Sequence, residues 1–385
     1  MVASKVLVVG SGVIGLRTSL ELLKKNVSVI LRSPRSPIHP SVCSQGAGGL
    51  WMPFHCDDPR TDRWAKETLD ELYPIGKDTS KPLVELVPTL ALHRKNHGPT
   101  TEDFIAKDYA SGTGGASQLP PWSTDARLEF QHMTIEMLEW QNSVMRLRIP
   151  SAKEILKAGY SYAWLFNPPI VDCPRMLENM LDEVKSKGAD VNVETGMEYE
   201  SLEEILDDAK GLGCDSVLNC SGLGAQKLCN DQELAGARGI LHHYNRKDLV
   251  RTEDISFQED GKDTNIMVDD GPWGSEEMPC YMIARGNTVV VGGSYLEGDT
   301  EGSIRDDERV KLLKNARLVG IDTEKISPVG EWTGFRPFRP ISRLELDTKF
   351  GNSDIPVVHS YGYGGSGWTV YVGAAKEATR LLLDS

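Results

Sequence analysis

A glycine-rich motif near the amino terminus constrains the fold of this chain more than any other feature. Residues 5–9, Lys-Val-Leu-Val-Val, form a short β-branched run that is typical of a buried parallel strand. Glycines follow at the spacing G-x-G-x-x-G over residues 10–15, and apolar residues then recur at helical spacing up to residue 25. A second apolar run over 27–31 completes a β-α-β unit. We therefore expect a dinucleotide-binding fold that starts at the first strand.

Each glycine of this motif has a physical reason if a dinucleotide binds there. Gly10 permits the tight turn, Gly12 lets a pyrophosphate approach the backbone, and Gly15 lets the helix pack close to the strand. The helix amino terminus adds N–H groups and a positive dipole end. The alternative is a glycine-rich turn without a ligand, but the strand–turn–helix context favours binding.

The end of the second predicted strand does not identify the nucleotide. Arg32 and Ser33 stand where NAD-binding proteins carry an acidic residue for the ribose hydroxyls. An arginine there can accept the 2′-phosphate of NADP, and the same two residues can hold the adenosine end of FAD. Nicotinamide and flavin cofactors both stay open at this point.

Composition excludes several other classes of protein. The chain has 385 residues, enough for two domains, and its net charge of −14 disfavours nucleic-acid binding. No apolar run approaches the ~18–20 residues of a membrane span. Seven cysteines without a C-x-x-C pair and eight histidines without ligand spacing predict neither a disulfide framework nor a metal site. His242 and His243 are expected at the surface or in a turn.

The pattern of elements changes along the chain. An α/β pattern returns after residue 170, with predicted helices over 174–187 and 202–210 and strands over 191–193 and 216–220. Short alternating runs then predict antiparallel strands over 265–268, 281–283 and 288–291. A strand over 356–359, a glycine-rich loop over 362–367 and a helix over 372–383 close the chain. This order implies a discontinuous nucleotide-binding domain with a second domain inserted in two pieces.

Four further segments follow in a fixed order: Gly-Ala-Gly-Gly-Leu-Trp-Met-Pro over 46–53, Ser-Val-Leu-Asn-Cys-Ser-Gly-Leu-Gly over 216–224, Gly-Phe-Arg-Pro-Phe-Arg-Pro over 334–340, and His-Ser-Tyr-Gly-Tyr-Gly-Gly-Ser-Gly-Trp-Thr over 359–369. Together with the amino-terminal motif, this set resembles the D-amino-acid oxidase family of FAD enzymes, which includes D-aspartate oxidase. The resemblance spans nearly the whole chain and is loose only between residues 75 and 160.

The resemblance implies a particular architecture. We expect an α/β fold with a Rossmann-like FAD-binding domain and an interleaved, mostly antiparallel β-sheet substrate domain. The FAD-binding domain would comprise residues 1–56, 170–230 and 330–385, and the substrate domain residues 57–169 and 231–329.

The resemblance also places FAD residue by residue. The phosphate loop would be Gly10, Ser11, Gly12, Val13, Ile14 and Gly15, with Arg32 and Ser33 at the adenosine ribose and Cys43 and Ser44 at the phosphates. Gly48, Gly49, Leu50 and Met52 would pass along the flavin, Ser221 would lie beside the cofactor, and Gly364, Gly367, Trp368 and Thr369 would surround the pyrimidine end. Mammalian members carry Gln at the position of Met52, so one side-chain hydrogen bond is expected to be lost.

The expected substrate site centres on Arg336. A guanidinium fork binds a carboxylate bidentately, and the first arginine of the G-x-R-P-x-R-P motif has this role in the family. The resemblance also assigns the carboxylate to the Tyr281 hydroxyl and the substrate amine to the Gly365 carbonyl. For Arg339 we expect a structural role instead. A second family tyrosine is replaced by Glu277, which is either a charge in the lid over the site or a solvated loop residue.

The implied reaction is the oxidation of a D-amino acid to a 2-oxo acid, ammonia and hydrogen peroxide, with FAD as cofactor and dioxygen as acceptor. Alternatives are a glycine- or sarcosine-type oxidase, an NADP-dependent reductase, a flavin-binding protein without turnover, and a D-aspartate oxidase with Arg285 or His55 as an extra cation. No nucleic-acid or membrane partner is expected, and a homodimer is compatible with the resemblance. Cytosol is the default compartment; the family also admits a peroxisome, but no Ser-Lys-Leu signal ends the chain.

Overall fold

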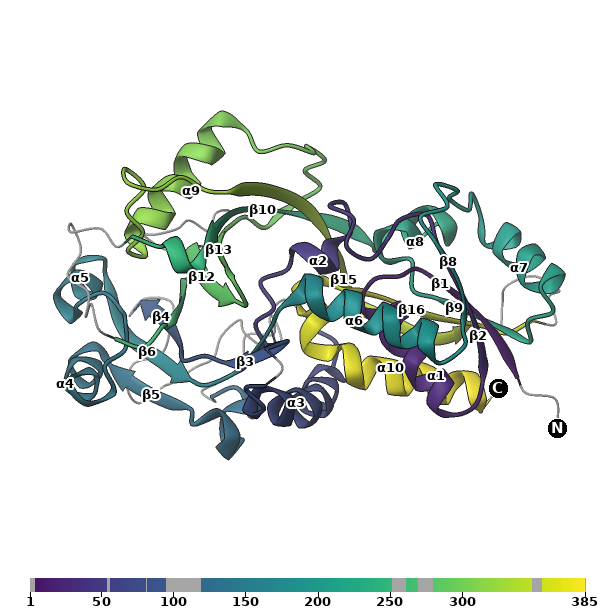
Figure 1. Cartoon of the computed structure of the whole chain (residues 1–385), viewed down its shortest axis with the longest axis horizontal. Coiled ribbons are helices and arrows are strands. Elements are labelled where there is room, and N and C mark those ends of the chain that lie inside the picture. The colour runs from purple at the N-terminus through teal and green to yellow at the C-terminus, as the bar shows by residue number, and fades with distance from the viewer. Residues whose placement is uncertain are drawn as a thin grey trace.

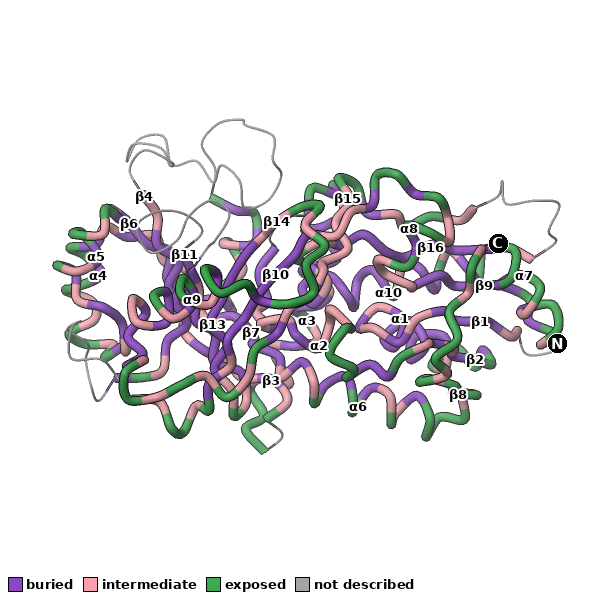
Figure 2. The backbone as a smooth tube through the Cα atoms, turned by 90° about the horizontal axis from the view of Figure 1, so that it is seen from above, coloured by how far each residue is buried: buried purple, intermediate pink, exposed green. Residues whose placement is uncertain are grey.

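One long β-sheet organises the molecule. The computed structural model describes residues 4–53, 56–80, 82–94, 119–250, 261–268, 280–347 and 355–384. Within these residues, a 14-stranded sheet runs in the order β5-β6-β4-β11-β12-β13-β10-β15-β16-β9-β1-β2-β8, with β14 beside β10 (Figure 1). Figure 2 shows buried residues along these strands from one end of the molecule to the other, with exposed residues on the outer helices.

The part of the sheet that carries the glycine motif is parallel. Its strands are β1 (Lys5–Val9), β2 (Ser28–Ser33), β8 (Asp190–Val193), β9 (Ser216–Asn219) and β16 (Val357–Tyr363). One face packs against α1 (Val13–Lys24), α3 (Thr61–Lys77), α6 (Cys173–Ser186) and α10 (Gly367–Leu383), and the other packs against α7 (Leu202–Gly211). Helices on both faces of a parallel sheet are the Rossmann-like arrangement that the sequence predicts.

The other part of the sheet is mostly antiparallel. Its strands are β4 (Thr89–Arg94), β5 (Gln131–Thr134), β6 (Tyr160–Phe166), β10 (Ala235–Asn245), β11 (Asn265–Val268), β12 (Cys280–Arg285), β13 (Thr288–Gly292), β14 (Leu296–Glu297) and β15 (Gly330–Asp347). Helices α4 (Ile135–Met145), α5 (Ala152–Lys157) and α9 (Asp306–Leu318) accompany them. The remaining elements are α2 (Cys43–Gly46), α8 (Ala225–Leu228), and a two-stranded sheet of β3 (Val84–Leu86) and β7 (Pro169–Val171).

Strand β15 joins the two parts of the sheet. The motif around Arg336 reads as a proline-rich turn, but it lies within this 18-residue strand, which pairs with β10 on one side and β16 on the other. Proline removes a ladder hydrogen bond and is confined to edges and bulges. Pro340 meets this restriction because the register with β16 shifts between Phe338 and Arg343.

Other predicted elements are confirmed with small shifts in their ends, and two expectations are wrong. Strand β16 continues to Tyr363 and α10 begins at Gly367, so the glycine-rich loop shrinks to the single 3-10 turn Gly364–Ser366. His242 and His243 lie within β10, and His242 is fully buried beside Glu331 rather than at the surface.

Among the described residues, no helix combines the length and apolar character needed to cross a bilayer.

Candidate functional site

The glycine motif lies where the order of the parallel strands reverses. Strand β1 pairs with β2 on one side and with β9 on the other, so the turn after β1 opens into the crevice that dinucleotides use in such sheets. Gly10 has a φ of +106°, and a Cβ on Gly15 would overlap the Gly10 carbonyl oxygen. A side chain at either position would therefore force the strand, turn and helix apart.

The start of α1 is prepared for an anionic group. Gly12 at the N-cap has no side chain with which to cap the helix, and Ser44 Oγ accepts from the Val13 N–H at 3.2 Å. Ser11 Oγ donates to Ser33 Oγ at 3.0 Å, so the serine after Gly10 and the end of β2 lie together. Half-buried Ile14 packs its side chain against the core of this half of the molecule. The free N–H groups fit a pyrophosphate.

Arg32 has a carboxylate partner that the sequence did not reveal. Its Nη2 and Nη1 lie 3.1 and 3.3 Å from the two oxygens of Asp190, which stands on the neighbouring strand β8. Cross-strand register brings these residues together, and no motif in the sequence links them. Asp190 neutralises the guanidinium and would compete with the 2′-phosphate of NADP for it.

The start of α10 is hydrogen-bonded to α2 and to the segment that follows it. Trp368 Nε1 donates to the Ser44 carbonyl at 2.8 Å, and Thr369 Oγ1 donates to the Met52 carbonyl at 2.9 Å. Both residues lie in the first turn of α10, which begins at Gly367. Ser44 contacts the starts of both α1 and α10. The contact between Met52 and Thr369 uses the backbone of Met52, so it does not require the glutamine side chain that mammalian relatives carry at this position.

The segment from Cys43 to Leu50 passes between the two parts of the sheet. Cys43 packs in an apolar cluster with Trp332 and Tyr281. Gly49 O accepts from Val171 N at 2.8 Å, and Leu50 forms an isolated bridge with Ile170. A Cβ on Gly48 would lie 2.6 Å from Ile283 Cδ1, so this segment runs directly over strand β12.

Arg336 and Tyr281 converge on one face of the antiparallel strands. The Arg336 side chain runs back over Gly239 of β10, where a Cβ would lie 2.5 Å from its Nη1. Arg336 Nη1 donates to the Ser294 carbonyl at 2.9 Å, and its guanidinium carbon lies 5.5 Å from the centre of the Tyr295 ring. Burial raises the pKa of the Tyr281 hydroxyl, and the hydrogen-bonded Arg336 beside it opposes that shift.

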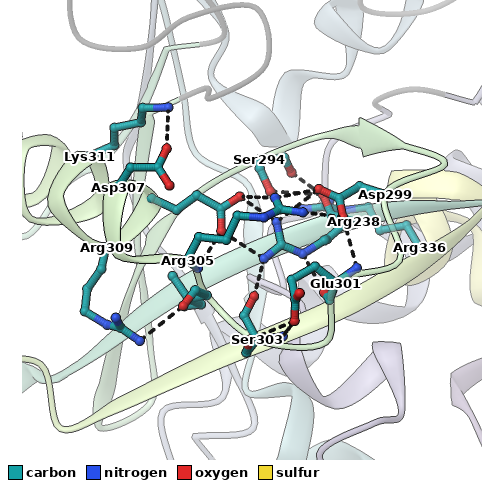
Figure 3. Close-up of polar contacts among 12 residues, drawn as sticks. Arg238, Ser294, Asp299, Glu301, Ser303, Arg305, Asp307, Arg309, Lys311 and Arg336 are labelled. Carbon is teal, nitrogen blue, oxygen red and sulfur yellow. Dashed lines mark hydrogen bonds and ion pairs between the residues drawn. The ribbon is translucent and has the colours of Figure 1, made fainter.

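A comparison with Arg238 shows why Arg336 is a candidate ligand-binding group (Figure 3). Arg238 is fully buried, and Glu308 accepts from its Nη1 and Nη2 at 2.6 and 2.9 Å. The carbonyls of Glu301 and Ser303 accept from the same guanidinium. Arg336, in contrast, has no carboxylate within ion-pair distance in the part of the chain that the structure describes. A half-buried guanidinium with a free edge, next to a tyrosine hydroxyl, can bind a carboxylate.

Two other predicted residues flank this group. Gly365 is exposed in the turn Gly364–Ser366, directly before α10. Arg339 pairs with Asp231 at 3.1 Å and donates to the Ile341 carbonyl, in keeping with a structural role. Sequence reasoning missed Tyr295, because its contact with Arg336 arises only when β13 and β15 pair with opposite sides of β10.

Arg285 does not lie next to Arg336. Tyr281 pairs with Gly292 and Arg285 with Thr288, so Arg285 is about 13 Å from Tyr281 along the strand. Arg336 bonds to Ser294, which is beyond Gly292 in the opposite direction. Buried Arg285 donates to the Gln45 carbonyl at 3.1 Å. The other candidate cation, His55, and the residue Glu277 lie outside the described residues.

The polar groups of this arrangement fit a flavin dinucleotide. Two helix amino termini, those of α1 and α10, meet on either side of Ser44, and Ser221 lies beside Gly10. The first fits a pyrophosphate, and the second fits the negative charge that a reduced flavin carries at its pyrimidine end. In this arrangement the Cys43–Leu50 segment would pass along the ring, next to the strands that carry Tyr281 and Arg336.

Comparison with known proteins agrees with this assignment. Residues 5–381 match the family model described as "DAO: FAD dependent oxidoreductase". A D-amino-acid oxidase of Dictyostelium discoideum is 27% identical over 98% of this chain and 90% of its own, and a human D-aspartate oxidase is 24% identical over 100% and 96%. A glycine oxidase from Geobacillus kaustophilus shares the fold, with a TM-score of 0.66 at 15% identity over 100% of this chain and 96% of its own.

Proposed function

Because the chain belongs to the DAO family of FAD-dependent oxidoreductases, we propose that it is a D-amino-acid oxidase. When bound, FAD accepts a hydride from the substrate α-carbon and passes the electrons to dioxygen, which yields hydrogen peroxide. The imino acid that leaves is hydrolysed to a 2-oxo acid and ammonia. The chain supplies the binding groups that hold the α-carbon against the flavin.

One observation carries the substrate assignment: Arg336 has a free guanidinium edge beside the Tyr281 hydroxyl. The α-carboxylate common to all amino acids matches this pair, with two N–H donors from Arg336 and an O–H donor from Tyr281. Tyr281 stays protonated near neutral pH because burial raises the pKa of its hydroxyl, so it can donate. The site then fixes one end of the substrate.

A second contact would select the enantiomer. The Gly365 carbonyl accepts the substrate amine, which fixes a second point, and the flavin face fixes the hydrogen as the third. An amine that binds neutral needs no protein base to prepare it. The absence of a catalytic His–Asp pair from the proposed contacts is therefore compatible with hydride transfer.

The course of the sheet supports the proposed division into domains. FAD would be held by residues 1–56, 170–230 and 330–385, which supply the parallel strands, and the substrate by residues 57–169 and 231–329, which supply most antiparallel ones. Arg336 lies on β15, where the two parts join. The substrate would therefore bind at the junction.

A D-aspartate oxidase is the second candidate, because human D-aspartate oxidase is among the relatives. Its substrate carries two carboxylates only a few ångströms apart, so it needs a second cation close to Arg336. Arg285 lies in the opposite direction along the sheet and already donates to the Gln45 carbonyl. Because Arg285 is not placed to bind the second carboxylate, the described residues favour D-amino acids with neutral side chains over D-aspartate.

Steady-state oxidation of paired enantiomers tests the proposal. Oxygen uptake and peroxide formation would be measured with D- and L-alanine, D- and L-valine, D-aspartate, glycine and sarcosine. We expect turnover with neutral D-amino acids, little with D-aspartate, and none with the L-enantiomers. Equal turnover of both enantiomers, or turnover of glycine and sarcosine alone, would overturn the proposal in favour of another flavin amine oxidase.

A further inference from the structure

A buried row of polar side chains connects the interior of the sheet to Ser221. Asn219 on β9 and His359 on β16 are register partners in adjacent parallel strands, and both are fully buried. Ser221 follows β9 by two residues and lies against the phosphate loop, since a Cβ on Gly10 would lie 3.2 Å from Ser221 Cα. Asp347, at the end of β15, flanks His359 on the other side.

The hydrogen bonds along this row are continuous. His359 Nε2 lies 3.2 Å from Asp347 Oδ2, and His359 Nδ1 lies 3.1 Å from Asn219 Nδ2. Asn219 Oδ1 accepts from the Ser221 N–H at 3.1 Å and from Ser221 Oγ at 2.7 Å. The row therefore runs Asp347–His359–Asn219–Ser221.

Chemistry fixes the direction of every bond in the row. Asp347 is a carboxylate held by Arg343 at 3.2 Å, so it can only accept, and His359 Nε2 must donate. His359 Nδ1 in the neutral ring then accepts from the Asn219 amide nitrogen, which turns the amide oxygen toward Ser221. Burial and Arg343 lower the pKa of His359, in keeping with the neutral ring.

The direction of these hydrogen bonds determines whether Ser221 can donate to a ligand or accept from it. Its N–H and O–H are both committed to Asn219, so only the lone pairs of Oγ remain. A phosphate at neutral pH presents acceptors and gains nothing from such a group. A ribose or ribityl hydroxyl presents a donor and does gain a hydrogen bond.

We propose that Asn219, His359 and Asp347 are positioning residues that hold Ser221 as a hydrogen-bond acceptor for a sugar hydroxyl of FAD. The proposal rests on the proposed function, because it takes Ser221 to lie beside that cofactor. It goes beyond the proposed function in two respects. It assigns a role to three residues that do not touch the cofactor, and it states that Ser221 accepts a hydrogen bond from FAD.

A double-mutant cycle on FAD affinity tests the row. The dissociation constant of FAD would be measured by the quenching of flavin fluorescence on adding apoprotein. One hydrogen bond is worth about 0.5–1.5 kcal/mol, so Ser221→Ala is expected to weaken binding roughly 2- to 13-fold. Asn219→Leu should weaken it to a similar extent, and Ser221→Ala/Asn219→Leu no further than either single change.

Conservative variants separate this role from a general loss of structure. Asn219→Asp keeps an acceptor for both Ser221 donors, and Asp347→Asn keeps an acceptor oxygen for His359. Both variants should therefore retain most of the FAD affinity. Asp347→Leu removes the acceptor and should weaken FAD binding. Asn315→Leu, which removes a buried amide in α9, serves as the matched control and should bind FAD normally. The variants at Asp347 also test the row if Asn219→Leu does not fold.

Two results would overturn the proposal. Either Ser221→Ala binds FAD as tightly as the parent protein, or Asn219→Leu weakens binding by the same factor with and without the Ser221 hydroxyl. In both cases, retained oxidation of D-alanine would leave the proposed function intact. An apoprotein that does not bind FAD at all would overturn both.

Discussion

Arg238 and Arg336 lie on adjacent strands, yet their surroundings give them opposite roles. Arg238 pairs in register with Phe335, the residue before Arg336, and every nitrogen of its guanidinium has a protein partner. Among the described residues, the guanidinium of Arg336 contacts the Ser294 carbonyl, the Tyr281 hydroxyl and the face of the Tyr295 ring, and it forms no ion pair. A buried charge is costly unless it is paired, so the fully paired Arg238 has a structural role, and the free donors of Arg336 fit the proposed binding of a carboxylate.

Arg336→Ala should lower kcat/KM for a D-amino acid by roughly 10²–10⁴-fold, because a desolvated charge-assisted pair is worth about 3–5 kcal/mol. Arg336→Lys should recover only part of this, since an ammonium cannot form the fork. Steady-state kinetics of the holoenzyme measure both effects. Arg309→Ala removes an exposed, ion-paired arginine and is the control. A loss below tenfold for Arg336→Ala with FAD retained would exclude this residue as the carboxylate partner.

The sequence predicted some of these residues and could not predict others. Arg336 and Tyr281 could be named because they stand in local motifs that resemble those of a family. Asp190 and His359 gain their partners through the pairing of neighbouring strands, and Tyr295, which follows β13, meets Arg336 only in the folded sheet. No local pattern contains these contacts. Arg32 shows the limit most plainly, because its sequence position suggested a phosphate but its neighbour on β8 is a carboxylate.

At the scale of elements, local patterns predicted the parallel strands and their helices well. Strands β1 and β9 are continuous apolar runs, and α6 and α7 carry apolar residues at helical spacing. Strands β10 and β15 were missed. Strand β10 contains Gly236, Gly239 and Arg238, and β15 contains two prolines, so both lack the ordinary strand pattern, and long-range pairing forms them instead.

Arg238 binds the loop between β13 and α9 through its hydrogen bonds to Glu301 and Ser303, and it pairs with Glu308 of α9. We expect the pair of Arg238 and Glu308 to stabilise the fold to an extent that depends on pH. Burial alone would raise the pKa of Glu308. Hydrogen bonds from Arg238 and from the Arg305 N–H outweigh this effect and lower the pKa from 4.5 to about 2. A carboxyl with a lowered pKa stabilises the fold above its unfolded value, and that contribution is lost as the pH falls from about 4.5 toward 2.

Glu308→Gln should therefore destabilise the protein by about 3 kcal/mol near neutral pH, and the difference should shrink at about pH 3. Urea denaturation of the two proteins at both pH values measures this change. Glu324→Gln, at an exposed position, should have little effect at either pH. A Glu308→Gln difference that stays constant between the two conditions would contradict the assignment.

At the scale of the whole molecule, the proposed cofactor site collects segments from distant parts of the chain. The turn after β1, the segment around Ser44, Ser221 and the start of α10 come together only when the sheet is complete. Sequence motifs predicted which segments would meet. They did not predict that the two parts would share one sheet through β15 and β16, because that pairing depends on the whole fold.

FAD binding should therefore stabilise the molecule as a unit. A ligand that binds only the folded state adds RT ln(1 + [L]/Kd), or about 2.7 kcal/mol at a hundredfold excess over Kd. The Tm of the apoprotein should rise with FAD concentration, in a scan followed by both circular dichroism and protein fluorescence. FMN, which lacks the adenosine end, is the control and should have a smaller effect. A Tm that does not depend on FAD concentration would contradict the site.

The most direct test of the central claim is the absorption spectrum of the bound flavin without oxygen. The holoenzyme would be mixed anaerobically with D-alanine, and separately with L-alanine, while the oxidised flavin band is followed. We expect D-alanine to bleach the band, L-alanine to leave it unchanged, and air to restore it with formation of hydrogen peroxide. Bleaching by both enantiomers, or by neither of them nor by any other D-amino acid with a neutral side chain, would contradict the account.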